Sequence, residues 1–290
     1  MIRSPFELAE PGPGHPGPPH PGPPRGSEEA GLEPRWPAWF GIAALVGAIF
    51  VQAFIGLLLT VAQVDVDADS PAVNIAGTLL LDASLIIIAL LLAARVMRPR
   101  LWHFGFRRTP LRSAIGWSAL GMLCFYAFAA AYQALLPREV EQSTLEQLGA
   151  GDSTTALIGA GLLIVIVAPV IEETFFRGFF YRALRSRFGI GASVVMAGGL
   201  FGLIHLGTGA EAVPPIAILG MAFCLVYERT GSLYPTIALH AVNNAVALTV
   251  SPEGSAAVAL PILLVVLAGC LVLPRFARAP GARLTPLRAT

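Results

Sequence analysis

The chain has 290 residues, of which 55% are hydrophobic and only 13% are charged, and its mean hydropathy is +0.70. Soluble domains carry about 25% charged residues, so this composition excludes an ordinary soluble protein. The formal net charge is only +1, which excludes a broad nucleic-acid-binding surface. We therefore predict an all-α, polytopic membrane protein whose surroundings are the lipid bilayer.

Residues 1–37 contain eleven of the 24 prolines. A stretch so rich in proline and glycine has no apolar face to bury. We predict that this segment is a disordered cytoplasmic tail that precedes the membrane domain.

Eight apolar segments follow, and each approaches the length of about 20 residues that a membrane span needs. Their ranges are 38–62, 73–94, 113–136, 154–171, 190–208, 213–228, 231–251 and 256–274. The sixth is the shortest, so we expect it to be tilted, partly re-entrant or shielded by its neighbours. The sequence thus predicts a transmembrane domain of about eight helices over residues 38–274 and a basic tail over 275–290.

The connections between these segments alternate in charge. Arginine is concentrated between the second and third segments, between the fourth and fifth, and after the eighth. The other connections are acidic. Because cytoplasmic loops carry an excess of basic residues, we expect the basic connections and both termini to lie in the cytoplasm.

The fourth segment ends in a cluster of charged residues. An ionisable side chain inside a membrane costs at least about 2.5 kcal/mol, so each one calls for an explanation. Glu173 precedes Arg177 by four residues, the favourable order for an ion pair on one helix face. Successive helix positions differ by about 100°, so Glu172 points elsewhere and is available for chemistry. An interfacial charge cluster is the alternative.

His205 lies in the fifth segment within a glycine-rich stretch that allows helices to approach closely. If the chain reverses at 187–191, an antiparallel hairpin brings Glu172 and His205 to the same depth. For His205 taken alone, a packing role is the alternative.

His240 and Asn244 are four residues apart in the seventh segment, so they share a helix face. Their depth differs from that of the hairpin pair, and a tilted helix or a break after Arg177 is needed to bring the two pairs together. Asp82, in the second segment, is expected to hydrogen-bond to a neighbouring helix, and lining a cavity is its alternative role.

Two histidines, a carboxylate and an asparagine favour hydrolysis. A carboxylate in a low-dielectric pocket can act as general base on water. Alternatively, Glu172, His205 and His240 would supply the three ligands of a catalytic zinc site. Both possibilities stay open at this point, although the His-Glu-x-x-His zinc motif is absent from the sequence.

These residues form three motifs in order: Glu-Glu-x-x-x-Arg at 172–177, Phe-x-x-x-His at 201–205 and His-x-x-x-Asn at 240–244. In this respect the chain resembles the CPBP intramembrane protease family, which includes the CAAX prenyl proteases and the bacterial Abi-type proteins. The likeness covers roughly residues 154–250.

The resemblance implies an intramembrane endopeptidase in a bacterial plasma membrane, acting on a peptide or protein substrate. By this resemblance Glu172 and His205 activate water, while His240 and Asn244 line the oxyanion site. Zinc is a possible cofactor, since both metal-dependent and metal-free mechanisms are argued for the family. The supporting residues implied are Glu173, Arg177 and Phe201.

Two other functions compete with peptide hydrolysis. One is a non-catalytic membrane protein that binds a peptide in the same cavity, as an immunity or scaffold protein would. The other is a proton-coupled transporter that uses Asp82, Glu172 and His205 as a proton path. The complete motifs favour hydrolysis over the first, and the lack of an inverted repeat disfavours the second.

Overall fold

The computed structural model describes residues 34–67, 70–136 and 144–277, and these residues form helices and no strand. The predicted all-α fold is therefore confirmed, while most of the predicted tail, residues 1–33, lies outside the described residues.

The longer helices are α2 (Trp39–Val61), α3 (Pro71–Ala94), α5 (Leu111–Leu135), α10 (Ile190–Leu203), α11 (Val213–Thr230), α12 (Leu233–Val250) and α13 (Ala256–Val272). The short α-helices are α4 (Leu101–Phe104), α6 (Thr144–Gln147), α7 (Thr154–Leu162), α8 (Ala168–Glu173) and α9 (Arg182–Arg185). The π-helical segments are η2 (Leu163–Val167) and η3 (Thr174–Tyr181), and the 3-10 turns are η4 (Leu206–Thr208), η5 (Ala210–Ala212) and η6 (Leu273–Phe276).

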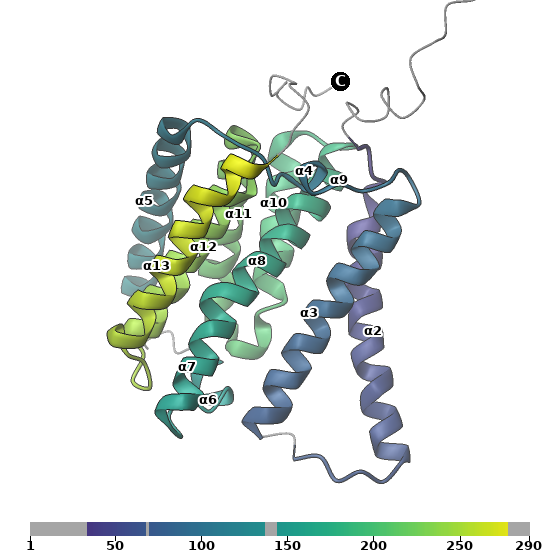
Figure 1. Ribbon diagram of the computed structural model, residues 1–290, viewed down its shortest axis with the longest axis vertical. Coiled ribbons are helices and arrows are strands. Elements are labelled where there is room, and N and C mark those ends of the chain that lie inside the picture. Colours follow the sequence, from purple (N-terminus) through teal and green to yellow (C-terminus); the bar gives the residue numbers. More distant parts are fainter. Residues whose placement is uncertain (1–33, 68–69, 137–143, 278–290) are drawn as a thin grey trace, which may run out of the picture. The chain divides into compact units, whose positions relative to one another are not determined.

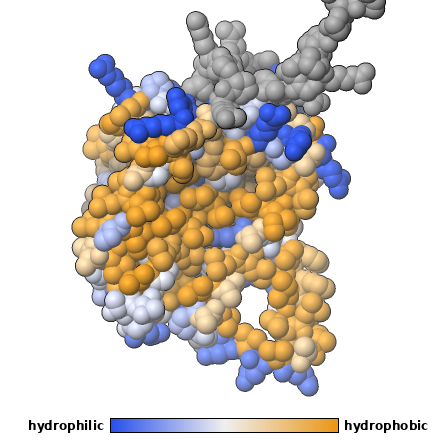
Figure 2. Space-filling model, viewed as in Figure 1, coloured by the Kyte–Doolittle hydropathy of each residue, from blue (hydrophilic) through white to orange (hydrophobic). Residues whose placement is uncertain are grey.

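Several of these helices suit a lipid bilayer. Their outward side chains form an apolar surface with hydrophilic residues at its two ends (Figure 2). Six stretches of the described residues are long and apolar enough to cross a membrane: Trp39–Val61, Pro71–Ala94, Leu111–Leu135, Thr154–Arg185, Ala210–Thr230 and Ala256–Phe276. The multi-pass architecture is thus confirmed. The count of eight stays a prediction, since it also requires the shorter α10 and the more polar α12.

The fifth predicted span differs from the structure, because α10 ends at Leu203 and not at residue 208. The ring Nδ1 of His205 lies 2.7 Å from the carbonyl oxygen of Phe201, the acceptor that would continue the helix. Farther on, Gly209 has a φ of 131°, which turns the chain away. The sixth predicted span is longer than expected, because η5 and α11 together run over 21 residues.

The fourth predicted span is part of a continuous helix from Thr154 to Arg185. The two π-helical segments widen this helix on either side of α8. Of the two alternatives, a tilted helix or a break after Arg177, the break is absent, because the helix continues as η3 and α9. Local π-helical geometry often accompanies functional sites, since it alters which way side chains and carbonyl groups point.

The connections lie at two opposite ends of the helices (Figure 1). We call one the arginine end: it comprises the segments 95–110, 186–189 and 231–232 together with η6, and its connections hydrogen-bond to each other. Arg107 Nε donates to the carbonyl of Gly231 at 2.7 Å, and Arg108 Nε donates to the carbonyl of Pro274 at 2.8 Å. We call the other the acidic end, which comprises the described segments 62–67, 144–153, 204–212 and 251–255.

The core near the arginine end is aromatic. Its fully buried rings include those of η3, where each aromatic side chain is at most 1% exposed. Trp36, within the predicted tail, is also fully buried and packs on Phe104 and Phe179, with ring centroids 5.0 Å away in each case. The packed unit therefore begins before the first span. The η3 aromatic residues are Phe175, Phe176, Phe179, Phe180 and Tyr181.

Candidate active site

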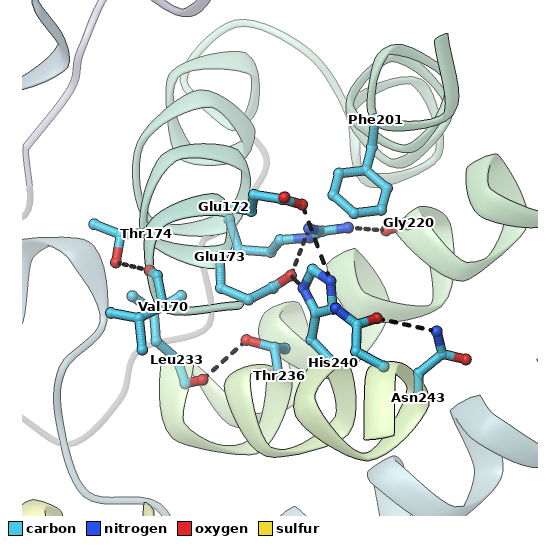
Figure 3. A network of polar contacts seen from close by, with 12 residues as sticks. Val170, Glu172, Glu173, Thr174, Phe201, Gly220, Leu233, Thr236, His240 and Asn243 are labelled. Carbon is cyan, nitrogen blue, oxygen red and sulfur yellow. Dashed lines mark hydrogen bonds and ion pairs between the residues drawn. The ribbon is translucent and has the colours of Figure 1, made fainter. Parts of the chain in front are cut away.

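The two adjacent glutamates of α8 have different surroundings (Figure 3). Glu173 is fully buried, and its Oε1 forms an ion pair of 2.7 Å with Arg177 Nη1, as predicted. The Glu172 side chain is 17% exposed and its Oε2 has no hydrogen-bond partner among the described residues. The helix thus directs one carboxylate into the core and leaves the other available, which is the division that the sequence predicts.

Arg177 connects the long helix to α11. Its Nη2 donates to the carbonyl of Gly220 at 2.9 Å, and its guanidinium carbon lies 4.4 Å from the centroid of the Phe201 ring. The charge is therefore balanced by Glu173 and enclosed by aromatic faces. A buried cation needs such compensation, because removing it from water is costly.

Glycine allows α10 and α11 to approach this closely. A Cβ at Gly198 would lie 2.6 Å from the backbone nitrogen of Met221, and one at Gly220 would lie 3.1 Å from Gly198 Cα. Gly202, one turn after Gly198, also faces α11, where a Cβ would lie 2.7 Å from the carbonyl oxygen of Val213. This small-residue contact positions Phe201 over the guanidinium of Arg177.

His240 lies between the two glutamates. Its Nδ1 is 3.0 Å from Glu173 Oε1, and its Nε2 is 4.0 Å from Glu172 Oε2. The contact with Glu173 was not predicted from the sequence, because the two residues lie on different helices and are 67 positions apart in the chain. Glu173 thus contacts both Arg177 and His240, and it fixes the imidazole so that Nε2 faces Glu172.

His205 lies in the turn that follows α10. Since its Nδ1 is bonded to the Phe201 carbonyl, which is only an acceptor, Nδ1 carries the proton of a neutral ring. This leaves Nε2 as the basic nitrogen. Phe201 lies between the two imidazoles, with ring centroids 4.9 Å from His205 and 5.8 Å from His240.

Asn244 is held by an irregularity of the long helix. The N–H of Ala168 donates five residues back, to the carbonyl of Leu163. In this register the carbonyl of Ile164 would accept from residue 169, which is a proline without an N–H. Asn244 Nδ2 donates to that carbonyl at 2.7 Å instead. One amide N–H is thereby used and the other is left for a further acceptor.

A single cavity of about 320 Å³ brings the predicted residues together. Glu172, His205, His240 and Asn244 all line it, together with Phe201. Glu173 and Arg177 lie behind its wall and hold it in place. The walls also include residues of α3 and α6, among them Asn74 and Leu145, which the sequence analysis did not single out. No local motif marks these residues, since they reach the cavity only through tertiary packing.

The zinc alternative needs three donors converging on one point. Glu172 and His240 approach to 4.0 Å, but within residues 34–67, 70–136 and 144–277 no group of three His, Cys, Asp or Glu side chains is arranged to hold a metal ion. The side chains as they lie therefore do not fit a three-ligand zinc site, and we assign no reaction step to a metal.

Asp82 is 9% exposed, and its buried Oδ2 has no hydrogen-bond partner in the described part of the chain. The expected hydrogen bond to a neighbouring helix is therefore not seen for this atom. Asp82 is not among the residues that line the cavity, which was its alternative role.

The comparison with family models gives a match over residues 154–246, to the Rce1-like family, described as type II CAAX prenyl endopeptidase Rce1-like. All three motifs lie within the matched residues. This match confirms the resemblance of that region to the CPBP intramembrane protease family. Comparisons with curated proteins and with solved structures give no significant match. The contributions of α3 and α6 to the cavity come from outside the matched region.

Proposed function

We propose that the chain is an intramembrane endopeptidase that hydrolyses a peptide bond with water activated by Glu172 and His205. The observation that carries this proposal is the single cavity lined by both of these residues together with His240 and Asn244. A glutamate, two histidines and an amide around one enclosed space suit general-base hydrolysis. The match to an endopeptidase family gives independent support.

In the proposed reaction Glu172 takes a proton from water, and the resulting hydroxide attacks the carbonyl carbon of the scissile bond. The basic Nε2 of His205 orients that water by accepting its second hydrogen. The proton then passes from Glu172 to the leaving nitrogen, the C–N bond breaks, and a carboxyl and an amine are released. Removal of a general base typically slows such a reaction by about 10²- to 10⁴-fold.

The oxyanion would be stabilised by two donors on α12. Protonated His240 donates from Nδ1 to Glu173 and can donate from Nε2 to the developing charge, while Asn244 offers its second amide N–H. Preorganised donors of this kind contribute on the order of 2.7–4 kcal/mol each to transition-state stabilisation.

The test is cleavage of a peptide library by the purified full chain in lipid vesicles. We expect Glu172→Gln and His205→Ala to lose at least about 100-fold in rate. The matched control is Glu211→Gln, an exposed carboxylate in η5, which should keep the unaltered rate. Equal turnover by Glu172→Gln and the unaltered chain would refute the mechanism.

Metal analysis of the same preparation addresses zinc. We expect no stoichiometric zinc and no loss of rate with a chelator. If zinc were bound it would supply Lewis-acid polarisation of water, and its loss in His205→Ala would favour that alternative. Peptide binding without turnover by the unaltered chain would instead support the non-catalytic peptide-binding protein.

A further inference from the structure

The two groups proposed to activate water belong to two separate parts of the molecule. Glu172 lies on the long helix Thr154–Arg185, whereas His205 follows the end of α10. Helix α10 is in turn fixed to α11, because the glycines at their contact leave no room for a Cβ. The position of His205 relative to Glu172 therefore depends on how α11 is held against the long helix.

Two contacts join α11 to the long helix at equal spacing. Arg177 makes the first, where its Nη2 donates to the Gly220 carbonyl. The second lies eight residues farther along both helices: Arg185 Nη2 is 3.2 Å from Glu228 Oε1, and Arg185 Nε donates to Glu228 Oε2 at 3.3 Å. The guanidinium thus bonds to both carboxylate oxygens. Equal spacing on the two helices means that they run in parallel and are matched at both contacts.

The Glu228 carboxylate is buried and is bonded by two side chains of the long helix. Its side chain is 6% exposed and that of Arg185 is 1% exposed. Tyr181, which is fully buried, donates its hydroxyl hydrogen to Glu228 Oε2 at 3.0 Å. Arg177, Tyr181 and Arg185 thus follow each other at intervals of four residues, and all three bond to α11.

A buried ion pair of this kind is weak evidence for stability, because desolvation offsets the attraction, and its best-attested role is to fix one arrangement of helices. Sliding α11 by one residue along the long helix would move it by about 1.5 Å and would break the two-pronged contact with Arg185. Arg182 also donates to the Tyr227 hydroxyl, at 3.3 Å. A single bond to a rotatable hydroxyl fixes the register less strictly than two bonds to a carboxylate.

We propose that Glu228 is a positioning residue: by fixing the register of α11 against the long helix, it holds His205 in its working position relative to Glu172. This inference rests on the proposed function for its consequence and on the contacts of Glu228 for its geometry. A misplacement of about 1 Å can cost about 10²-fold in rate. A loosened register therefore slows catalysis even where the helices stay folded.

An apolar replacement of the whole contact separates positioning from stability. The triple variant combines Tyr181→Phe, Arg185→Met and Glu228→Met, and replacing a buried ion pair by apolar side chains of similar volume is often neutral for stability. We expect the thermal midpoint to stay close to that of the unaltered chain. The value of kcat per folded molecule, with the folded fraction taken from gel filtration, should fall at least about tenfold, while KM changes little.

A contact with only a structural role would lower the folded fraction and leave kcat per folded molecule unaltered. That result in the triple variant would overturn the proposal. The matched control is Arg229→Met, on the position after Glu228, where an exposed arginine lies over the Trp117 ring. It should keep both the midpoint and kcat.

Spin-label distances test the register without any cleavage. The chain used has alanine in place of the two cysteines that are not buried, Cys124 and Cys270. One label pair, on the exposed positions of Ile158 and Leu203, joins the long helix to α10; the control pair, on exposed Leu203 and Leu225, joins α10 to α11. In the triple variant we expect the first distance distribution to shift or broaden and the second to stay unaltered. An unaltered first distance would overturn the proposal.

Tyr181→Phe alone decides the matter where the triple variant gives no folded protein, since it removes one hydrogen bond to Glu228 and keeps the ion pair. We expect kcat to fall by about two- to tenfold and the first label distance to broaden. An unaltered label distance would again overturn the proposal. Absence of cleavage by the unaltered chain would instead count against the proposed function, and it would leave the distance result valid.

Discussion

The half of the helical unit near the arginine end and the half near the acidic end are built differently. In the first, aromatic rings of α10 and α11 face the guanidinium of Arg177, which forms a buried ion pair with Glu173. In the second, α3, α6 and α12 surround a cavity with polar walls. The boundary between the halves runs between two consecutive residues, Glu172 and Glu173. The comparison teaches that one half is a packed support for Glu173 and His240, while the other half contains the cavity onto which Glu172 faces.

The largest effect is expected from Glu173→Gln, which tests the half near the arginine end. The change leaves the Arg177 charge buried without its partner, and breaking a buried ion pair in this way typically costs about 3–5 kcal/mol. We expect a large fall in the thermal midpoint in detergent and little folded protein. The neighbouring Glu172→Gln is the control and should change the midpoint little, because its carboxylate has no such partner. Similar midpoints for the two variants would refute the division between the halves.

Gly198→Ala tests the contact of α10 with α11. Its Cβ would lie 2.6 Å from the backbone nitrogen of Met221, so the helices must move apart, and overpacking of this kind costs about 1–3 kcal/mol. Gly199→Ala is the matched control on the next position, where a Cβ meets nothing within 4 Å. We expect thermal denaturation to separate the two variants, and equal midpoints would show that the close approach is not required.

Pro169→Ala tests the link between the long helix and the cavity. The new N–H can take the Ile164 carbonyl, which releases Asn244 from its position. One hydrogen bond is worth about 0.5–1.5 kcal/mol, so we expect the cleavage rate to fall by about two- to tenfold while the thermal midpoint does not fall. The control is Pro261→Ala, within α13, which should keep the rate. An unchanged rate in Pro169→Ala would mean that Asn244 needs no such support.

The smallest effect concerns the acidic end. The Ser251 hydroxyl donates to Glu253 at 2.6 Å, and this hydrogen bond is the main cause that lowers the pKa of the partly exposed Glu253 carboxyl below its usual range. A lowered pKa contributes stability above the carboxyl's ordinary pKa, and this contribution is lost as the pH falls through the lowered value. Ser251→Ala should therefore raise the Glu253 pKa in an NMR titration. An unmoved pKa would show that the hydroxyl is not its cause.

Local patterns in the sequence predicted what depends on helix periodicity. The ion pair of Glu173 with Arg177 and the separate direction of Glu172 follow from angles along one helix, and both are confirmed. The spans α2, α3 and α5 follow from hydrophobicity and lie within two residues of their predicted bounds.

What the sequence did not predict depends on contacts between distant segments. Helix packing produces three such features. These are the hydrogen bond between His240 and Glu173, the π-helical segments around α8, and the hydrogen bond that Asn244 donates to the Ile164 carbonyl. Helix α10 ends early because the His205 ring nitrogen occupies the Phe201 carbonyl in place of a backbone N–H. The periodicity of apolar residues does not encode such a contact. The predicted count of eight spans is not confirmed for a related reason, since α12 carries polar residues of the candidate site and is not among the six candidate spans of the described residues.

The cavity walls contributed by α3 and α6 have a consequence for how substrate selectivity can change between related proteins. The residues proposed to react belong to the matched stretch of chain, and a separate part of the cavity wall belongs to α3 and α6. Mutations in α3 and α6 can alter substrate selectivity while the residues proposed for catalysis stay unchanged. Proteins with identical motifs can therefore differ in their targets, and exchanging residues 70–94 and 144–148 between such proteins should transfer preference without transferring catalysis.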